Sequence, residues 1–451
     1  MLNLIIGVSK YIFLITLALF TLLSFITLTG SRSKGVRFCF FLQSVALYVF
    51  HVISGIVIFA NTEDITVIAF YIIGLIYFIM FRGLHTVFYE EAYDRGVMND
   101  MCMLLDIGFV MLCRLDYQKA IKQFLIVIVI SIVAIIIPVI IRKSRILAHL
   151  TYFYCFAGLG FLISVLIVGN ITKGAKLFLS FHGFTFQPSE FVKILFVFFL
   201  AAFLSKDASF GRIVLSAFFA GLHIIILVIS RDLGSALIFF MVYIIMIYIA
   251  SKHIIYIFAG LSAGGIAAVA GYYLFSHVRI RVQAFLHPYA DMNGTSYQIS
   301  RSLLAIATGG FMGLGLYKGS PNKIPEVEMD FMFSAISHEL GAFFAIILII
   351  LCASCFISFA NIAMRQRDMF YKLIGVGLSI TYAVQTVLTI GGAIKFIPST
   401  GVTLPLISYG GSSVLCTIIM FGVFQGISVH AFDDEENEYQ QNLEQNNSKS
   451  R

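Results

Sequence analysis

Long uninterrupted runs of apolar residues are the feature that most restricts how this chain can fold. About thirteen runs approach or reach the ~20 residues that an α-helix needs to cross a bilayer. Of the 451 residues, 60% are hydrophobic and only 12% are charged, whereas a soluble domain carries about 25% charged residues. Short alternating segments typical of a β-barrel are absent from these runs. The sequence therefore predicts an all-α polytopic membrane protein with spans near 5–28, 38–60, 66–88, 98–114, 121–141, 149–168, 188–204, 212–229, 233–250, 254–275, 332–358, 370–391 and 404–430.

Basic residues between the spans indicate how the chain is oriented, because cytoplasmic loops are enriched in Lys and Arg. Most of them fall on one side if the N-terminus is outside and the C-terminus is cytoplasmic, and loops with Lys119 and Lys173 are the exceptions. In a cell membrane this orientation makes the polar segment 276–331 extracytoplasmic. It makes the tail 431–451 cytoplasmic, and we expect that tail to be disordered because it has few apolar residues. The basic residues expected on the cytoplasmic side are Arg32, Lys34, Arg37, Arg142, Lys143, Arg145, Lys206, Arg212, Lys252, Arg365, Arg367 and Lys372.

Several common functional patterns are missing from the sequence. It has no glycine-rich phosphate loop, no dinucleotide-binding fingerprint and no metal motif. It also has no basic patch with interleaved aromatic residues, so we do not expect a nucleic-acid partner. The seven cysteines show no disulfide or metal-binding spacing. The chemistry must therefore come from charged groups in or beside the membrane, where each charge is costly and is a functional hypothesis.

Two charged stretches lie near the ends of predicted spans. In "FQPSEFVK" (186–193), Glu190 suits the first turn of a helix, and Lys193 follows one turn deeper. In "SRDLGSAL" (230–237), Asp232 falls at a depth similar to that of Lys193, which favours an ion pair between the two. Such a pair either holds two helices together or belongs to an active site, and the sequence leaves both alternatives open.

Two further stretches carry polar groups at membrane boundaries. In "IPEVEMDFMFSAISHELG" (324–341), Glu326 and Asp330 begin a span, where they either complement a helix N-terminus or form a metal- or phosphate-linked site. Their spacing alone favours the first alternative. In "STGVTLPLISYGGSSV" (399–414), small residues mark either a broken helix that lines a cavity or a close packing face. The small residues of this stretch that are candidates for a site are Ser408, Gly410, Gly411 and Ser412.

The stretch "AFLHPYADMNGTSYQIS" (284–300) is a polar island whose one acid is Asp291. Asn293, Gly294 and Thr295 follow closely and favour a turn. The alternatives are a solvated loop carboxylate and a catalytic acid presented at the outer surface. On the residues alone, the solvated loop is favoured.

Taken together, these stretches resemble the SEDS family (shape, elongation, division and sporulation), which includes the FtsW, RodA and SpoVE types. The resemblance covers roughly residues 98–430. It implies a SEDS-type ten-helix core, with three additional spans in residues 1–97. It also implies a peptidoglycan glycosyltransferase that polymerises lipid II into glycan strands during elongation, division or sporulation. The family works with a class B penicillin-binding protein. The motifs, in family order, are "QPSE" with Lys193, "DLGSAL", P-x-x-D-x-x-G-x-x-Y-Q, "GGFMGLGL", "PEVEMDFMFSAISHELG" and "TLPLISYGGSS".

The resemblance also implies roles for individual residues. Asp291 matches the family's essential extracytoplasmic acid and would be catalytic, as the acceptor of a proton from a sugar hydroxyl. Lys193 and Asp232 match the family's charge pair. A divalent cation, Mg²⁺ or Mn²⁺, is a further candidate for stabilising the pyrophosphate, and the sequence leaves the metal requirement open. The residues expected to bind substrate or pyrophosphate are Arg281, Lys193, Glu326, Asp330, Ser408, Gly410, Gly411 and Ser412.

Departures from the family pattern leave the subgroup open. The chain has no Trp, Ser-Arg precedes Asp232, and Glu328 and His338 replace other residue types. Two other functions compete with the glycosyltransferase reading. A lipid II flippase would need charges along a path deep in the membrane. A non-catalytic scaffold for a penicillin-binding protein would have no reason to keep Asp291, Lys193 and Asp232.

Overall fold

A computed structural model describes residues 2–28, 34–144, 146–172, 175–181, 184–291, 294 and 296–449. Arg32, Arg145, Lys173, Asn293 and Thr295 lie outside the described residues. The all-α polytopic fold class is confirmed, since twelve helices in the described part are long and apolar enough to cross a membrane. They are α1 (Leu2–Thr27), α2 (Lys34–Thr62), α3 (Ile65–Tyr89), α4 (Arg95–Leu115), α5 (Tyr117–Lys143), α6 (Thr151–Val168), α8 (Phe210–Ile229), α9 (Leu233–Ser251), α10 (Ile255–Leu274), α13 (Met332–Arg365), α14 (Met369–Ala393) and α15 (Gly411–Lys449).

Shorter elements complete the chain. The remaining predicted span is α7 (Pro188–Leu204), which has 17 residues and begins with proline in its first turn, where no N–H is needed. The segment between α10 and α13 holds α11 (Ser276–Leu286) and α12 (Tyr297–Gly309). Two single 3₁₀ turns lie at Leu147–His149 and Pro321–Lys323.

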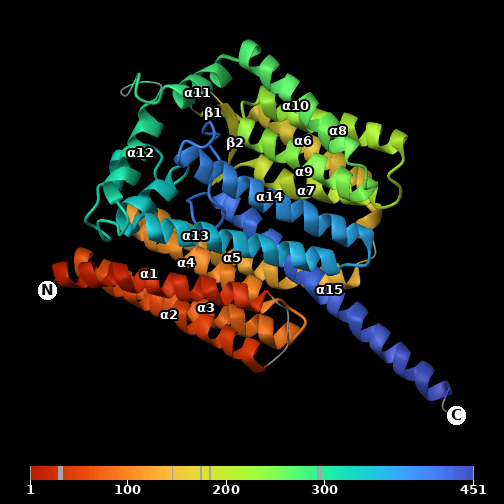
Figure 1. Ribbon diagram of the computed structural model, residues 1–451, viewed down its shortest axis with the longest axis horizontal. Coiled ribbons are helices and arrows are strands. Elements are labelled where there is room, and N and C mark those ends of the chain that lie inside the picture. The colour runs from red at the N-terminus through yellow and green to blue at the C-terminus, as the bar shows by residue number, and fades with distance from the viewer. Residues whose placement is uncertain are drawn as a thin grey trace.

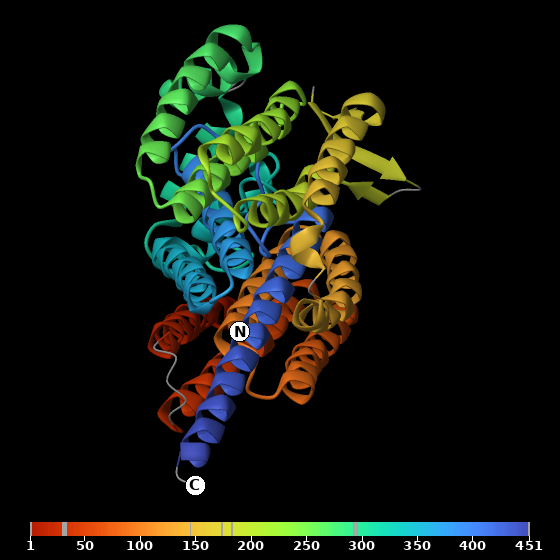
Figure 2. The ribbon, with the colours of Figure 1, turned by 90° about the vertical axis from the view of Figure 1, so that its right-hand side faces the viewer.

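The helices form layers that run roughly parallel to the longest axis of the molecule (Figure 1). Helices α1–α3 pack together along one side, α4, α5, α13, α14 and α15 occupy the middle, and α6–α10 lie on the other side (Figures 1 and 2). The N- and C-termini lie at opposite ends of the molecule (Figure 1). Helices α11 and α12 cover the end that is far from the C-terminus, and they frame the candidate site (Figure 1).

Helix α4 is enclosed by its neighbours, and every residue from Gly96 to Cys113 is buried. Its polar side chains find partners on the N-terminal helices. Asp106 Oδ1 lies 2.6 Å from His51 Nδ1, and Asp100 accepts a hydrogen bond of 2.9 Å from the Ser24 hydroxyl. Buried polar groups need such partners, so these contacts tie α1 and α2 to α4.

Helix α13 is broken at Gly341, whose φ of 93° is accessible to glycine at little cost. The segment that follows α12 fills the break. The Ala342 N–H donates to the Gly310 carbonyl at 3.0 Å, and the Gly315 N–H donates to the Glu339 carbonyl at 2.8 Å. These hydrogen bonds hold the segment 310–315, which follows α12, against the break in α13.

A small antiparallel sheet was not predicted from the sequence. Its strands β1 (Asn170–Thr172), β2 (Ala175–Phe181) and β3 (Phe184–Phe186) follow one another in space between α6 and α7. Leu179 pairs with Phe186 and Ser180 with Thr185. Strands this short carry too few alternating residues to give a clear periodic signal.

The prediction of a disordered tail is wrong for residues 431–449, which continue α15 as helix. Glu, Gln and Leu in this segment are good helix formers. Arg142 and Arg367 also pair with acids of the same segment, Asp433 at 2.6 Å and Glu438 at 2.5 Å respectively. Low hydrophobicity therefore did not prevent order, because the helix extends one that is already formed in the membrane.

Candidate active site

A cavity of about 200 Å³ opens at the end of the molecule covered by α11 and α12. Both of these helices line it, together with the turn that precedes α13 and the non-helical segment before α15. The cavity combines two charged side chains with a largely apolar wall. Its lining residues are Ile280, Arg281, Ala284, Phe285, Gln298, Ile299, Asp330, Phe331, Ile397, Ser399 and Gly401.

Arg281 and Asp330 bring opposite charges to this cavity from different segments. The Arg281 guanidinium donates a hydrogen bond of 3.2 Å to the Ser399 carbonyl. Burial lowers the pKa of Arg281, while the carboxylates of Asp330 and Asp232 act in the opposite direction and favour its charged form. The arrangement holds a cation at the wall of an open cavity, where it can meet an anionic ligand.

The turn that carries Glu326 and Asp330 is held by its own backbone and by the segment before α15. Glu326 has a φ of 54°, and its carbonyl accepts the N–H of Asp330 at 3.1 Å. The Ser408 hydroxyl donates to the Met329 carbonyl at 2.6 Å, and the Tyr409 N–H donates to the Glu328 carbonyl at 2.7 Å. Ser408 therefore positions the Asp330 turn and does not line the cavity.

Asp291 lies on an exposed turn between α11 and α12. Its carbonyl accepts the N–H groups of Gly294 and Ser296, each at 3.3 Å. A Cβ at position 294 would overlap the Asp291 carboxylate in this rotamer, so glycine leaves that side chain room beside the turn. Asp291 belongs to the loop that joins the two helices of the cavity wall, but it is not one of the lining residues.

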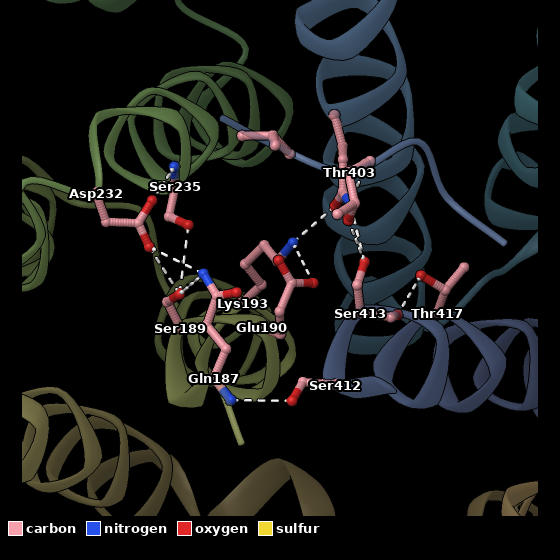
Figure 3. A network of polar contacts seen from close by, with 12 residues as sticks. Gln187, Ser189, Glu190, Lys193, Asp232, Ser235, Thr403, Ser412, Ser413 and Thr417 are labelled. Carbon is pink, nitrogen blue, oxygen red and sulfur yellow. Dashed lines mark hydrogen bonds and ion pairs between the residues drawn. The ribbon is translucent and has the colours of Figure 1, made fainter. Parts of the chain in front are cut away.

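A second polar region is closed (Figure 3). Lys193 Nζ lies 2.8 Å from Glu190 Oε2 and donates a hydrogen bond of 2.7 Å to Gln385 Oε1. Both charged side chains are about 5% exposed. The predicted ion pair between Lys193 and Asp232 is wrong. Lys193 instead pairs with Glu190, which lies three residues earlier on the same helix.

Asp232 belongs to a neighbouring set of contacts (Figure 3). Its Oδ1 accepts the Ser235 N–H at 3.1 Å and so caps the N-terminus of α9. Its Oδ2 accepts hydrogen bonds from the Ser189 hydroxyl at 2.8 Å and from the Gln187 amide at 3.4 Å. Asp232 thus joins the first turns of α7 and α9 without a direct bond to Lys193.

The small residues at the start of α15 pack against other helices. The Gly410 N–H donates to Gln123 Oε1 of α5 at 3.1 Å, and the Ser412 hydroxyl accepts the Gln187 N–H at 2.9 Å (Figure 3). Gly411 faces the Ile126 side chain. These three residues fix the start of α15 between α5 and α7. Of the two alternatives for this motif, their contacts favour a close packing face.

Sequence reasoning overlooked two basic groups near Arg281. The pKa of His277 in α11 is lowered by burial and by the positive charges of Arg231 and Arg281. Arg231 precedes Asp232 and has a φ of 64°. The Ser-Arg departure from the family pattern was the available signal, but only the fold reveals that it adds a positive charge beside this site.

The residues present do not form a metal centre of their own. Within the described ranges, no three His, Cys, Asp or Glu side chains gather closely enough to hold a metal ion. Arg281 and Arg231 supply positive charge beside the cavity instead.

Fold and site define a polytopic membrane protein with a charged cavity at one membrane surface. The chain belongs to the FtsW/RodA/SpoVE family of cell cycle proteins, whose family model matches residues 96–432. It is 31% identical to the peptidoglycan glycosyltransferase RodA of Mycobacterium tuberculosis over 393 residues, covering 79% of this chain and 82% of that protein. It is 34% identical to the stage V sporulation protein E of Bacillus subtilis over 284 residues, covering 59% and 75% of the two chains.

Solved structures show the same fold. A chain from a peptidoglycan synthase complex matches with a TM-score of 0.65 and 24% identity, covering 76% of this chain and 99% of that one. The rod shape determining protein RodA of Thermus thermophilus matches with a TM-score of 0.55 and 23% identity, covering 75% and 97%.

Proposed function

We propose that this protein is a peptidoglycan glycosyltransferase that polymerises lipid II at the outer face of the cytoplasmic membrane. The observation that carries the proposal is the open cavity with Arg281 and Asp330, framed by the two helices whose connecting loop presents Asp291. Family membership and the peptidoglycan glycosyltransferases among its relatives support it.

The reaction joins two lipid-linked sugars. A sugar hydroxyl attacks the anomeric carbon of the donor, a new C–O bond forms, and the bond from that carbon to the pyrophosphate oxygen breaks. The hydroxyl is a weak nucleophile, so a carboxylate within hydrogen-bond reach accelerates the step by taking its proton. Asp291 is the proposed acceptor. Catalytic hydrogen bonds commonly shorten only when substrate is bound, so its place outside the empty cavity is compatible with this role.

The departing pyrophosphate carries negative charge that needs stabilisation as it develops. Arg281 is held at the cavity wall, and Arg231 adds positive charge nearby, while the neutral ring of His277 can donate a hydrogen bond. Asp330 and Glu326 are proposed to orient Arg281 and the sugar hydroxyls, since carboxylates accept hydrogen bonds from both. The contacts of Ser408, Gly410, Gly411, Ser412 and Lys193 support a positioning role for these residues.

The orientation of the chain follows from the positive-inside rule and from the position of the site. Lipid II is used at the outer surface, so the α11–α12 end is proposed to be extracytoplasmic, with the N-terminus outside and the C-terminus cytoplasmic. A class B penicillin-binding protein is the proposed partner, because crosslinking must follow polymerisation. The similar chain from a peptidoglycan synthase complex supports that choice.

We infer that residues 1–97, which contain α1–α3, are an addition to the family core. The family model begins at residue 96. Because Asp106 and Asp100 use partners on α2 and α1, removing this unit would leave polar groups on α4 facing lipid. A truncation starting at residue 95 is therefore expected to be less stable in detergent, while the molecules that fold still polymerise lipid II.

The direct test is to incubate the purified protein, its partner transpeptidase and lipid II, and to resolve the products on a gel. A ladder of glycan polymer is expected. Transfer of lipid II across a vesicle membrane without polymer would instead favour the flippase. Polymer made only by an added polymerase would favour the scaffold.

A further inference from the structure

A second cavity, of about 320 Å³, lies at the opposite end of α13 from the candidate active site. Four segments meet around it: the end of α1, the start of α2, the turn before α4 and the last turns of α13. The 34 residues of α13 correspond to roughly 50 Å of helix, so the two cavities face opposite membrane surfaces. This cavity also lies at the junction between the N-terminal helices and the family core.

Three guanidinium groups line the cavity, and each comes from a different segment. They belong to Arg37 of α2, Arg95 of α4 and Arg365 of α13. Arg95 lies over the Tyr93 ring at 5.9 Å, and Arg365 acts on Asp94 through its charge. Within the described part of the chain, none of the three makes an ion pair at 4.0 Å or less. The cavity therefore gathers cations that other side chains do not neutralise at close range.

Two acids share the lining, and their roles differ. Asp94 caps α4, where its Oδ1 accepts the Val97 N–H at 3.0 Å, and burial raises its pKa. Glu91 is exposed at the rim. Three arginines against these two acids leave a net charge of 3 − 2 = +1 in the lining. A ligand with one negative charge would balance it.

The remaining lining residues indicate what kind of anion fits. Ser358 and Asn361 offer hydroxyl and amide groups, while Leu28, Phe40 and Ile362 are apolar. Guanidinium groups bind phosphate oxygens through paired hydrogen bonds. Basic pockets between membrane helices on the cytoplasmic side bind lipid headgroups, with the acyl chains beside the apolar wall.

We propose that this cavity binds the phosphate headgroup of an anionic glycerophospholipid from the cytoplasmic leaflet, and that the lipid joins α1 and α2 to α4 and α13. A phosphoglycerol headgroup fits best. Its single negative charge matches the net charge of the lining, and its hydroxyl groups can donate to Glu91 and accept from Asn361. A phosphoethanolamine headgroup is zwitterionic and would leave the positive charge unbalanced.

The test measures lipid binding to the full chain in detergent, with a fluorescent phosphatidylglycerol as the probe. Replacing both Arg37→Gln and Arg95→Gln should weaken binding about tenfold or more, because two charge-assisted hydrogen-bond donors are lost. Arg212→Gln is the matched control, since Arg212 lies over the Phe203 ring and is not part of the cavity lining. It should bind the probe as the unmodified chain does.

Competition distinguishes the possible sources of the phosphate. Unlabelled phosphatidylglycerol should displace the probe, whereas phosphatidylethanolamine and glycerol phosphate should require at least tenfold higher concentrations. Displacement by glycerol phosphate at the same concentration would overturn the lipid assignment, and equal displacement by phosphatidylethanolamine would overturn the anionic one. Equal binding by the double variant and the unmodified chain would refute the site.

A single variant distinguishes a loss of lipid binding from misfolding of the protein. Arg37 is exposed, so Arg37→Gln alone should leave the unfolding temperature in lipid-free detergent unchanged while it still weakens binding severalfold. Added phosphatidylglycerol should raise the unfolding temperature of the unmodified chain more than that of Arg37→Gln. An equal rise in both would contradict the proposal, because the lipid would then act elsewhere.

Discussion

Two charged regions near one end of the molecule differ in how completely their charges are used. Glu190, Lys193 and Gln385 form a closed set in which each charged group has a partner and is about 5% exposed. Arg281 and Asp330 instead line an open cavity of about 200 Å³. Glu190 and Lys193 of the first region and Asp330 of the second all belong to family motifs, so a motif by itself does not distinguish a structural charge from one that meets a ligand.

The difference has a physical cause. A buried ion pair is costly to desolvate, and its charges are retained only when their neighbours satisfy them. A charge at a cavity wall keeps part of its bonding capacity for a ligand. We therefore expect the closed region to control stability and the open region to control turnover. Asp232 lies between the two, because it accepts a hydrogen bond from Ser189 beside Glu190 and also favours the charged form of Arg281.

The largest effect is expected from Arg281→Gln, which removes the cation from the open region. Polymerisation should fall about 10²–10³-fold, as when a preorganised electrostatic contact to a transition state is lost. The unfolding temperature should change little. Arg279→Gln is the control in the same helix, since Arg279 is exposed and donates to the Tyr273 carbonyl. Equal losses in both variants would show that general positive charge matters and not the cavity.

The closed region should show strong coupling in a double-mutant cycle. Lys193→Met leaves Glu190 buried without its cation and should lower the free energy of unfolding by about 3–5 kcal/mol. Adding Glu190→Gln should recover part of that loss, whereas Asp232→Asn should be nearly additive with Lys193→Met. Chemical unfolding in detergent gives these values. Strong coupling to Asp232 together with additivity for Glu190 would reverse the pairing described above.

The contact between the N-terminal helices and α4 should have a smaller effect. His51→Ala removes the partner of Asp106 and should cost about 1–3 kcal/mol of stability. His85→Ala is the comparison, because the only described hydrogen bond of His85 is to the Phe81 carbonyl in its own helix. Thermal unfolding of the two variants should therefore differ. If they are equally stable, the Asp106–His51 contact does not hold this layer in place.

The smallest effect is expected from Ser408→Ala, which removes the hydrogen bond from the Ser408 hydroxyl to the Met329 carbonyl in the Asp330 turn. The cost should be about 1 kcal/mol in stability, with a severalfold loss of polymerisation because Asp330 is held less firmly. Ser379→Ala is the control, as its hydroxyl donates within its own helix, to the Gly375 carbonyl at 2.7 Å. Unchanged turnover in Ser408→Ala would show that the turn holds its shape without this bond.

The sequence predicted the helices far better than the contacts between them. The predicted span 188–204 coincides with α7, and 233–250 differs from α9 by one residue, because apolar runs report burial in lipid directly. The last span was expected from residue 404, but α15 begins at Gly411, since residues 404–410 form hydrogen bonds to α5 and to the Asp330 turn. Those partners lie far away in the chain.

The site shows the same limit. Asp291 and Arg281 could be singled out from the family resemblance, but the choice of Glu190 as the partner of Lys193 depends on side-chain positions in the folded helices. The predicted depths in the membrane placed Lys193 and Asp232 at a similar level. They could not show whether Asp232 or Glu190 lies nearer to the lysine. The proximity of Arg231 to His277 depends on α11 lying near the turn between α8 and α9, and no local pattern reports that.

The most direct test of the proposed chemistry is to measure Asp291→Asn for both polymerisation of lipid II and unfolding temperature, with the partner transpeptidase present. Asparagine keeps the shape of the side chain but cannot take the proton from the attacking hydroxyl. We expect glycan polymer to be lost while the unfolding temperature stays within about 1–2 °C of that of the unmodified chain, because Asp291 is on an exposed turn. Polymer formation near the unmodified rate would contradict the assignment of Asp291 as the proton acceptor.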